Sequence, residues 1–130
     1  MNTQTSEGVT ISVKTGLEDV FPSSEALQYL FSYTIRIENN NPYPVRLMSR
    51  HWTITDSGGE VREVQGDGVV GEQPVIHPGE DYEYSSACDL STEIGKMQGS
   101  YFMRREEGDF DEEFEVEIPD LRLTAPARLN

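Results

Sequence analysis

The ten residues 29–38, YLFSYTIRIE, decide the fold class of this chain. Large apolar side chains stand at every second position, and Ser32, Thr34, Arg36 and Glu38 stand between most of them. A period of two places alternate side chains on opposite faces of a β-strand, one buried and one facing water. The stretch therefore predicts a strand that buries one face in a core.

The same period recurs along most of the chain. Val9, Ile11 and Val13 alternate with polar residues, and further short alternating runs follow residues 45, 61, 80, 100 and 113. The phase of the run after Val45 changes before Trp52, which predicts a bulge near residues 48–50. Turn signals separate the runs, at residues 39–42 (NNNP), at 56–59 (DSGG) and at Pro78-Gly79.

Seven to nine short strands with little sign of a helix predict an all-β protein, an antiparallel β-sandwich of the fibronectin type III or immunoglobulin-like kind. A length of 130 residues fits one domain over 1–130 with one core. We expect residues 1–8 to be flexible and 125–130 to form a tail. The longest expected loops are 16–27 and 66–73, with a short turn over 23–27 between the first two strands.

The chain is strongly acidic, with 24 acidic and 10 basic residues and a net charge of -14. This charge argues against nucleic acid and anionic membranes as partners and favours basic partners or metal ions. A single cysteine, Cys88, rules out an internal disulfide, and no stretch is apolar enough for a signal peptide or a membrane span. The expected location is the cytoplasm.

Residues 66–71, GDGVVG, match the G-x-G-x-x-G pattern of dinucleotide-binding loops. That motif needs a helix directly after the glycines, and Pro74 and Pro78 leave no room for one. No lysine or arginine occurs from Glu63 through Gly95, so a phosphate would meet acidic neighbours. Two interpretations stay open: a ligand cradle of backbone N–H groups, or turns that require positive φ, and the second is favoured.

Arg50-His51-Trp52 is the second candidate site. Arg50 and His51 either present a cation and an imidazole on an exposed sheet face, or cover the edge of a core that Trp52 fills. The second interpretation is again favoured, because a buried tryptophan is common in such sandwiches. The candidate ligand-binding residues are Gly66, Gly68, Gly71, Arg50 and His51.

No catalytic or metal-binding set emerges from the spacing. His77 and His51 lack partners at zinc-ligand spacing, and nothing near Cys88 in the sequence activates its thiol. The acidic run over 106–113, EEGDFDEE, does not have the spacing of an EF-hand and is interpreted as a solvated hairpin end, although weak divalent binding is compatible with it. We expect no cofactor, no dedicated metal site and no enzymatic activity.

Several separated motifs resemble the bacterial ApaG family: SRHWTITD at 49–56, the glycine segment at 66–74, PGE at 78–80 and GKMQGSY at 95–101. The resemblance covers nearly the whole chain, from about Val9 to Leu123, and implies a fibronectin type III or immunoglobulin-like sandwich. It implies no settled activity: the family name reflects a genetic association with a diadenosine tetraphosphate hydrolase, and family descriptions mention cobalt and magnesium efflux. Related domains in F-box proteins and in a polymerase-interacting protein point to partner binding. Thr92-Glu93 departs from the threonine-proline usual there, which puts the geometry of that turn in question.

Two functions follow as hypotheses. The preferred one is a non-enzymatic interaction module that binds another protein, by adding a partner strand to a sheet edge or by forming a homodimer through the same edge. The alternative is a nucleotide or pyrophosphate binder, assisted by a metal ion, in which Arg46, Arg50 and Arg62 contact phosphates.

Overall fold

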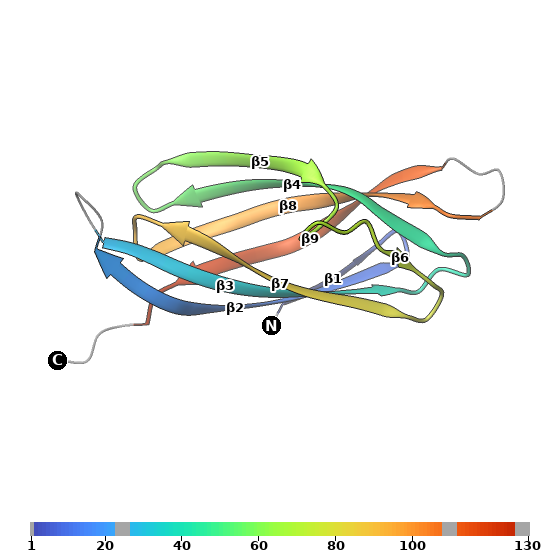
Figure 1. Ribbon diagram of the computed structural model, residues 1–130, viewed down its shortest axis with the longest axis horizontal. Coiled ribbons are helices and arrows are strands. Elements are labelled where there is room, and N and C mark those ends of the chain that lie inside the picture. The colour runs from blue at the N-terminus through green and yellow to red at the C-terminus, as the bar shows by residue number, and fades with distance from the viewer. Residues whose placement is uncertain (1, 23–26, 108–111, 127–130) are drawn as a thin grey trace.

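The computed structural model describes residues 2–22, 27–107 and 112–126, which form strands and no helix. The strands build two antiparallel sheets packed face to face (Figure 1). This confirms the predicted all-β sandwich of seven to nine strands. The strands are β1 (Asn2–Ser6), β2 (Val9–Pro22), β3 (Leu27–Asn39), β4 (Val45–Asp56), β5 (Val61–Asp67), β6 (Val75–Ile76), β7 (Asp81–Leu90), β8 (Ile94–Arg105) and β9 (Glu113–Thr124).

One sheet has the order β1-β2-β3-β7 and the other has the order β5-β4-β8-β9, with the short β6 paired to β4. The chain crosses between the sheets after β3 and again around β7, so each sheet contains strands distant in sequence. The finer assignment to a fibronectin type III or immunoglobulin-like sandwich stays a prediction.

The core lies between the sheets and is made by the inward positions of the alternating runs. Trp52, Tyr101 and Phe31 are its largest fully buried side chains. Burying each such side chain stabilises the fold by roughly 1.5–3 kcal/mol. The alternation noted in the sequence is therefore what drives the two sheets together.

The bulge predicted near residues 48–50 is confirmed. The pairing of β4 with β8 shifts register between Leu47 and Ser49. One extra residue on β4 returns Trp52 to the same face as Leu47, so both side chains are buried. The same shift turns Arg50 toward the inter-sheet side and His51 toward the outer face.

The loop expected over 16–27 is largely wrong. Strand β2 continues to Pro22 and pairs with β3 as far as Leu27, with a register shift between Leu17 and Asp19. The bulge leaves Glu18 without a partner in β3 and interrupts the alternation of apolar residues. Pairing resumes from Asp19, so the sequence pattern ended before the strand did. The turn expected over 23–27 lies mostly outside the described residues.

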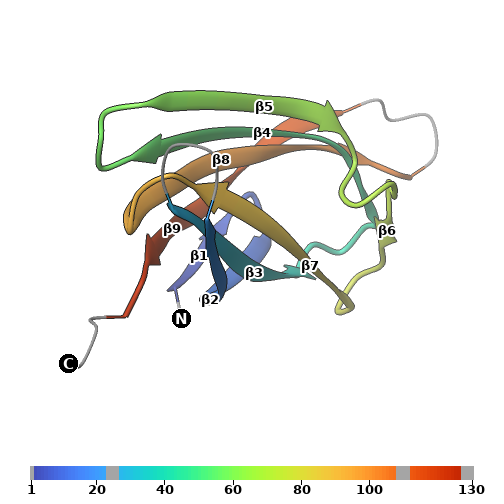
Figure 2. The same cartoon turned by 60° about the vertical axis from the view of Figure 1, so that its left-hand side comes forward.

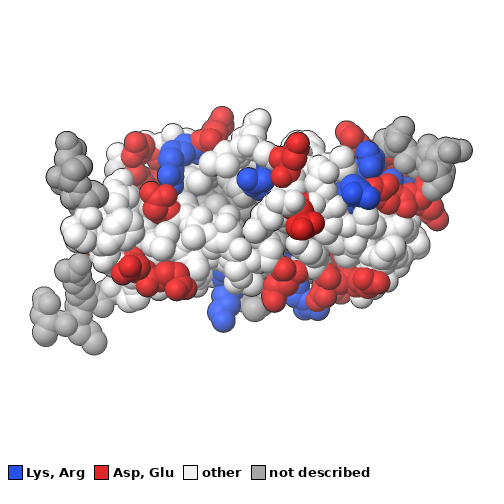
Figure 3. Space-filling model, viewed as in Figure 1, with Lys and Arg blue, Asp and Glu red and all other residues white. Residues whose placement is uncertain are grey.

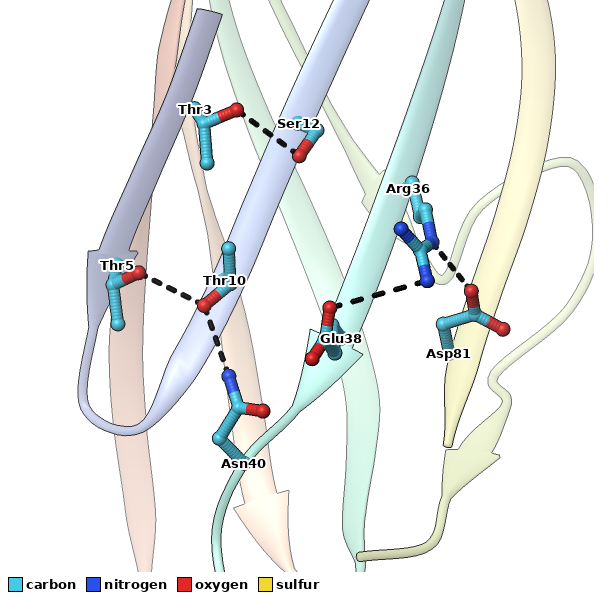
Figure 4. A network of polar contacts seen from close by, with 8 residues as sticks. All are labelled: Thr3, Thr5, Thr10, Ser12, Arg36, Glu38, Asn40 and Asp81. Atoms are coloured by element: carbon cyan, nitrogen blue, oxygen red, sulfur yellow. Dashed lines mark hydrogen bonds and ion pairs between the residues drawn. The ribbon is translucent and has the colours of Figure 1, made fainter. Parts of the chain in front are cut away.

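The sequence predicts a flexible N-terminus over 1–8, and the structure has a strand, β1, within this segment. Strand β1 pairs with β2 along its whole length. Its threonine side chains face outward, where the Thr3 hydroxyl lies 3.2 Å from that of Ser12 and the Thr5 hydroxyl 2.8 Å from that of Thr10 (Figure 4). Because β1 contains no apolar residue, its sequence shows no alternation of apolar and polar side chains from which a strand could be predicted. Of the expected tail, Ala125 packs against the core, and 127–130 lie outside the described residues.

The two long sides of the sandwich differ. On one side β1 and β2 pack against β9 (Figure 2), where the Asn2 amide donates to the Asp120 carbonyl and the Thr15 hydroxyl to the Arg122 carbonyl. On the other side the edge strands are β5 and β7. The side between β5 and β7 holds the candidate site. No helix in the described part of the chain is long and apolar enough to cross a membrane.

Candidate functional site

The three glycines of the G-x-G-x-x-G segment have different structural roles. Gly66 lies in β5 opposite Arg50, and its missing side chain leaves room for the Arg50 guanidinium, whose Nη1 would lie 3.0 Å from an added Cβ. Gly68 and Gly71 have φ of 60° and 79°, in the left-handed region that glycine adopts without steric strain. Backbone geometry thus explains Gly68 and Gly71, and the space taken by the Arg50 guanidinium explains Gly66.

Three backbone N–H groups of the segment form hydrogen bonds within the protein. The Gly68 N–H donates to the Met48 carbonyl at 2.9 Å. The Val69 N–H donates to the Glu72 carbonyl at 2.8 Å, and the Glu72 N–H donates back to Val69 at 2.9 Å. A cradle for a ligand needs unbonded N–H groups, so these three donors do not supply one. This favours the turn interpretation of the segment.

Arg50 holds the glycine segment against β4. Its Nη1 donates to the backbone carbonyls of Asp67 and Gly68 at 3.1 and 2.8 Å. Within the described residues, no carboxylate lies within 4.0 Å of the Arg50 guanidinium. Arg50 therefore stabilises two peptide dipoles but has no counter-charge.

The structure separates His51 from Arg50. His51 lies on the outer face, with Nε2 3.8 Å from a carboxylate oxygen of Glu63. Trp52 is buried, as the favoured interpretation of this motif requires. Of the five candidate residues, the fold brings Arg50 together with Gly66 and Gly68, while His51 faces a different region of the surface.

A cavity of about 350 Å³ opens between β5 and β7. This volume falls within the range of small-molecule sites, roughly 300–1,000 Å³. Arg50 and Arg62 both line it, so the fold does place two of the three arginines considered for phosphate binding at one site. The other lining residues are Tyr33, Trp52, Ile54, Val64, Val69, Val70, Tyr84, Ser86, Ala87, Cys88, Asp89 and Met97.

Arg62 connects the two edges of the cavity. From β5 its Nη2 donates to the Asp89 carbonyl at 2.5 Å, and its Nη1 lies 3.5 Å from the Asp89 carboxylate on β7. The third arginine, Arg46, instead forms an ion pair with Glu106 at another part of the sheet. Arg46 does not line the cavity, so the cavity does not support a role for Arg46 in phosphate binding.

The wall residues from the opposite sheet were not singled out in the sequence. Alternation indicated that Tyr33 and Tyr84 face inward, but not that they meet Arg50 across the sandwich. The hydroxyl groups of Tyr84 and Tyr101 are hydrogen-bonded to each other in the buried region. Burial raises the pKa of Tyr33, Tyr84 and Tyr101 above the ordinary tyrosine value, and the Arg50 charge offsets part of each shift.

We expect these three tyrosines to stay protonated for as long as the fold persists. In the unfolded chain tyrosine ionises near pH ~10. A pKa raised in the folded state contributes stability that is fully present below the unfolded pKa and is lost as pH rises toward the folded pKa. Stability to urea should therefore fall steadily above pH ~10, and tyrosinate absorbance should show late ionisation coupled to unfolding. Ionisation of all six tyrosines near the ordinary pKa in the folded protein would contradict this expectation.

Cys88 is buried beside the cavity, with its Sγ 3.5 Å from Nη2 of Arg62. Burial raises the pKa of its thiol, with the Arg62 charge opposing the shift. The protonated thiol is the less nucleophilic form. Cys88 thus has the character of a packed side chain.

The described part of the acidic run is largely paired with arginines. Glu106 contacts Arg46 and Arg104, which lower the pKa of its carboxyl, and Arg105 contacts Glu107. Residues 108–111 lie outside the described residues. Nowhere in the ranges that the structure describes do three or more histidine, cysteine or acidic residues gather as metal ligands would.

Fold and site together define a β-sandwich protein with a cavity at one open side. The family model of the ApaG domain matches residues 21–105. The chain is 43% identical over 126 residues to Protein ApaG of Brucella canis, covering 97% of this chain and 95% of the relative. It is 42% identical over its full length to Protein ApaG of Anaeromyxobacter dehalogenans strain 2CP-C, covering all of both chains. The chain belongs to the ApaG family.

Solved structures agree with this assignment. A structural-genomics target solved by X-ray crystallography superposes with a TM-score of 0.87 at 43% identity, over 94% of this chain and 90% of that chain. A protein from Bordetella pertussis described as putative ApaA gives a TM-score of 0.78 at 41% identity, over 92% of this chain and 95% of that chain. The fold described above is therefore that of experimentally determined relatives.

Proposed function

We propose that this protein is a non-enzymatic interaction module that accepts a strand of a partner protein along the edge of β5. The observation that carries the proposal is that β5 is an exposed edge strand with apolar side chains beside it. Within the described residues β5 pairs only with β4. Every residue of β5 except Gly66 is exposed.

The other edges are less suited to a partner. Strands β1 and β9 pack against each other's sheets. Strand β7 carries three exposed acidic residues, Asp81, Glu83 and Asp89. Beside β5, by contrast, the exposed fractions of Val61, Val64 and Val70 are 58%, 38% and 63%. Apolar side chains along an unpaired edge favour the addition of a strand.

The hydrogen-bonding phase of β5 follows from its two ends. The Asp56 N–H donates to the Glu60 carbonyl at 3.0 Å, and the Gly68 N–H donates to Met48 at 2.9 Å. In an antiparallel pair every second residue bonds to the neighbouring strand and the intervening residues turn their backbone groups away. The residues whose N–H and C=O groups are directed away from β4 are therefore Val61, Glu63, Gln65 and Asp67, and of these groups the Asp67 carbonyl already accepts from the Arg50 side chain.

The charge of the protein indicates the chemistry of the partner. Acidic side chains are spread over the face of the molecule shown in Figure 3, with basic groups between them, and the net charge is -14. A basic or apolar strand would approach β5 without repulsion, whereas an acidic one would be repelled. The partner expected here is a segment of low acidity with alternating apolar side chains.

A proline at Glu63 tests this edge. The substitution Glu63→Pro removes an N–H that points away from β4, so it blocks strand addition while keeping the β4–β5 ladder. We expect affinity capture from cells that produce the protein to lose its specific partner, with little change in thermal stability. In the unsubstituted protein, partner binding should slow hydrogen exchange at Val61, Glu63 and Gln65.

The matched control is Glu115→Pro on β9, the opposite edge strand of the same sheet. The Arg105 N–H donates to Glu112 at 2.9 Å, and the same alternation turns the Glu115 N–H away from β8. Capture that survives both substitutions would rule out the β5 edge. Loss of self-association in Glu63→Pro, measured by sedimentation, would identify a second copy as the partner.

Two observations support the nucleotide hypothesis, the lack of a carboxylate beside Arg50 and the position of Arg50 and Arg62 at one cavity. Against it stand the internally bonded N–H groups of the glycine segment and the ion pair that holds Arg46 elsewhere. Calorimetry with ATP and diadenosine polyphosphates, with and without magnesium, tests it, and no heat at millimolar ligand would exclude it.

A further inference from the structure

We propose that the cavity between β5 and β7 binds a small organic anion with one carboxylate and an apolar body. This site adjoins the β5 backbone edge and shares Val64 and Val70 with it, but it lies between the sheets, whereas a partner strand would pair with the outward backbone groups of β5. The charge of its arginines, the chemistry of its walls and its size carry the inference.

Arg50 supplies the charge. Its side chain lines the cavity and is only partly exposed, and the ion pairs of the described residues include none to Arg50. Its Nη1 donates to two carbonyls, and no hydrogen bond within the described structure involves its Nε or Nη2. In a protein of net charge -14, a partly buried cation without a carboxylate marks a place for an anion.

The number of charges at the cavity selects a monoanion. Arg62 is already compensated, since Asp89 lies 3.5 Å from it on β7. Arg50 therefore leaves one net positive charge among the lining residues. A diphosphate carries more negative charge than this site neutralises and would also face Asp89, whereas a single carboxylate matches it and suits the fork of a guanidinium.

The walls select an apolar body. Ile54, Val64, Val69, Val70 and Met97 contribute aliphatic surface to the cavity. Ser86 and the aromatic residue Tyr33 add polar groups on the opposite wall. About 350 Å³ accommodates a ring or a short chain attached to the carboxylate.

Trp52 provides a reporter within the wall. It is the only tryptophan of the chain, and its buried Nε1 has no hydrogen-bond partner in the described structure. The Cε3 side of its indole packs on β8, where a Cβ on Gly99 would lie 2.7 Å from Cε3. Nε1 belongs to the other side of the ring, away from Gly99.

The test is a nuclear magnetic resonance titration of the ¹⁵N-labelled full chain with 4-phenylbutyrate. We expect saturable shifts of the single indole N–H signal of Trp52 and of the amides of Val64, Val69 and Ala87. The neutral amide 4-phenylbutyramide has the same body without the charge and should bind at least about tenfold more weakly. ATP and pyrophosphate are titrated in the same way, to test whether the cavity binds phosphates instead.

Two variants test whether Arg50 supplies the positive charge that binds the carboxylate. Arg50→Gln removes the proposed anchor and should weaken 4-phenylbutyrate binding about tenfold or more. Arg122→Gln removes an arginine outside this cavity that likewise has no ion pair among the described residues, and it should leave binding unchanged. If Arg50→Gln does not fold, the comparison of 4-phenylbutyrate with its amide in the unsubstituted protein still tests whether the cavity selects an anion.

Equal shifts by acid and amide would overturn the proposal, because the cavity would then not select an anion. Absence of shifts at millimolar acid would overturn it as well. Shifts at these residues by pyrophosphate but not by 4-phenylbutyrate would replace it with the phosphate hypothesis. None of these outcomes affects the test of the β5 edge, which depends on Glu63→Pro.

Discussion

Replacing Gly68 with alanine is expected to destabilise the fold by ~3 kcal/mol or more. Gly68 has a φ of 60°, and an added Cβ would collide with the backbone carbonyl of Glu72. That carbonyl accepts the Val69 N–H, so the turn cannot move aside without breaking its own hydrogen bonds. Urea unfolding followed by far-ultraviolet circular dichroism measures the loss.

Gly71 is the matched control in the same segment. Its φ of 79° is also positive, but an added Cβ meets nothing within 4 Å. Gly71→Ala should lower the free energy of unfolding only by the strain of a left-handed backbone conformation, roughly 1–2 kcal/mol. Gly66→Ala should have a different consequence, because the added Cβ meets the side-chain guanidinium of Arg50 rather than the backbone. Equal losses in Gly68→Ala and Gly71→Ala would show that the collision with Glu72 is relieved and that φ alone matters.

Asn39→Asp is expected to be the other most damaging substitution, with a loss of ~3 kcal/mol or more at neutral pH. The Asn39 side chain is fully buried, and its Nδ2 donates to the carbonyls of Tyr43 and Ile76 at 2.9 and 2.8 Å. A carboxylate of the same shape would place negative charge against both carbonyls. The connection between β3 and β4 and the position of β6 depend on these bonds.

The loss in Asn39→Asp should depend on pH in a defined direction. Burial and the two carbonyls favour the neutral acid, so the pKa of the new carboxyl is raised in the folded state above its unfolded value of ~3.9. Relative to the unsubstituted protein, stability is therefore regained as pH falls through the raised pKa and is lost as pH rises through it. Urea unfolding of both proteins across the acid range tests this.

Asn40→Asp is the control for Asn39→Asp. It makes the same change of charge one residue away, at an exposed amide that donates to the Thr10 hydroxyl at 2.9 Å (Figure 4). We expect a change within about 0.5 kcal/mol and no comparable dependence on pH. Similar losses in the two variants would mean that net charge, rather than the buried hydrogen bonds of Asn39, is responsible.

Most of the fold was predictable because alternation reports directly on burial. The run over 29–38 became β3, and the phase change before Trp52 located the bulge of β4. The polar strand β1 and the end of β2 were missed for one reason. Neither segment shows a regular alternation of apolar and polar residues. Backbone hydrogen bonding between strands does not require such a pattern, so a polar or bulged strand cannot be predicted from it.

The candidate site was predictable only in part. The sequence singled out Arg50 and the glycines, and the structure joins Arg50 to Gly66 and Gly68. It did not indicate that Arg62 would reach β7 or that Tyr33 would share a wall with Arg50. Those relations depend on how the two sheets are superposed, which no local pattern encodes.

The sequence by itself determined the fold class, the family motifs and the acidic character of this protein, because each follows from residue types and their local spacing. The tertiary structure alone decided which sheet edge stays open, where the cavity lies and which arginine has no counter-charge. Cross-strand pairing brings together residues far apart in the chain, so charges that look isolated in sequence, such as Arg62 and Asp89, become partners. In the described structure no carboxylate of the protein pairs with Arg50. We therefore propose that the carboxylate of a bound ligand does so.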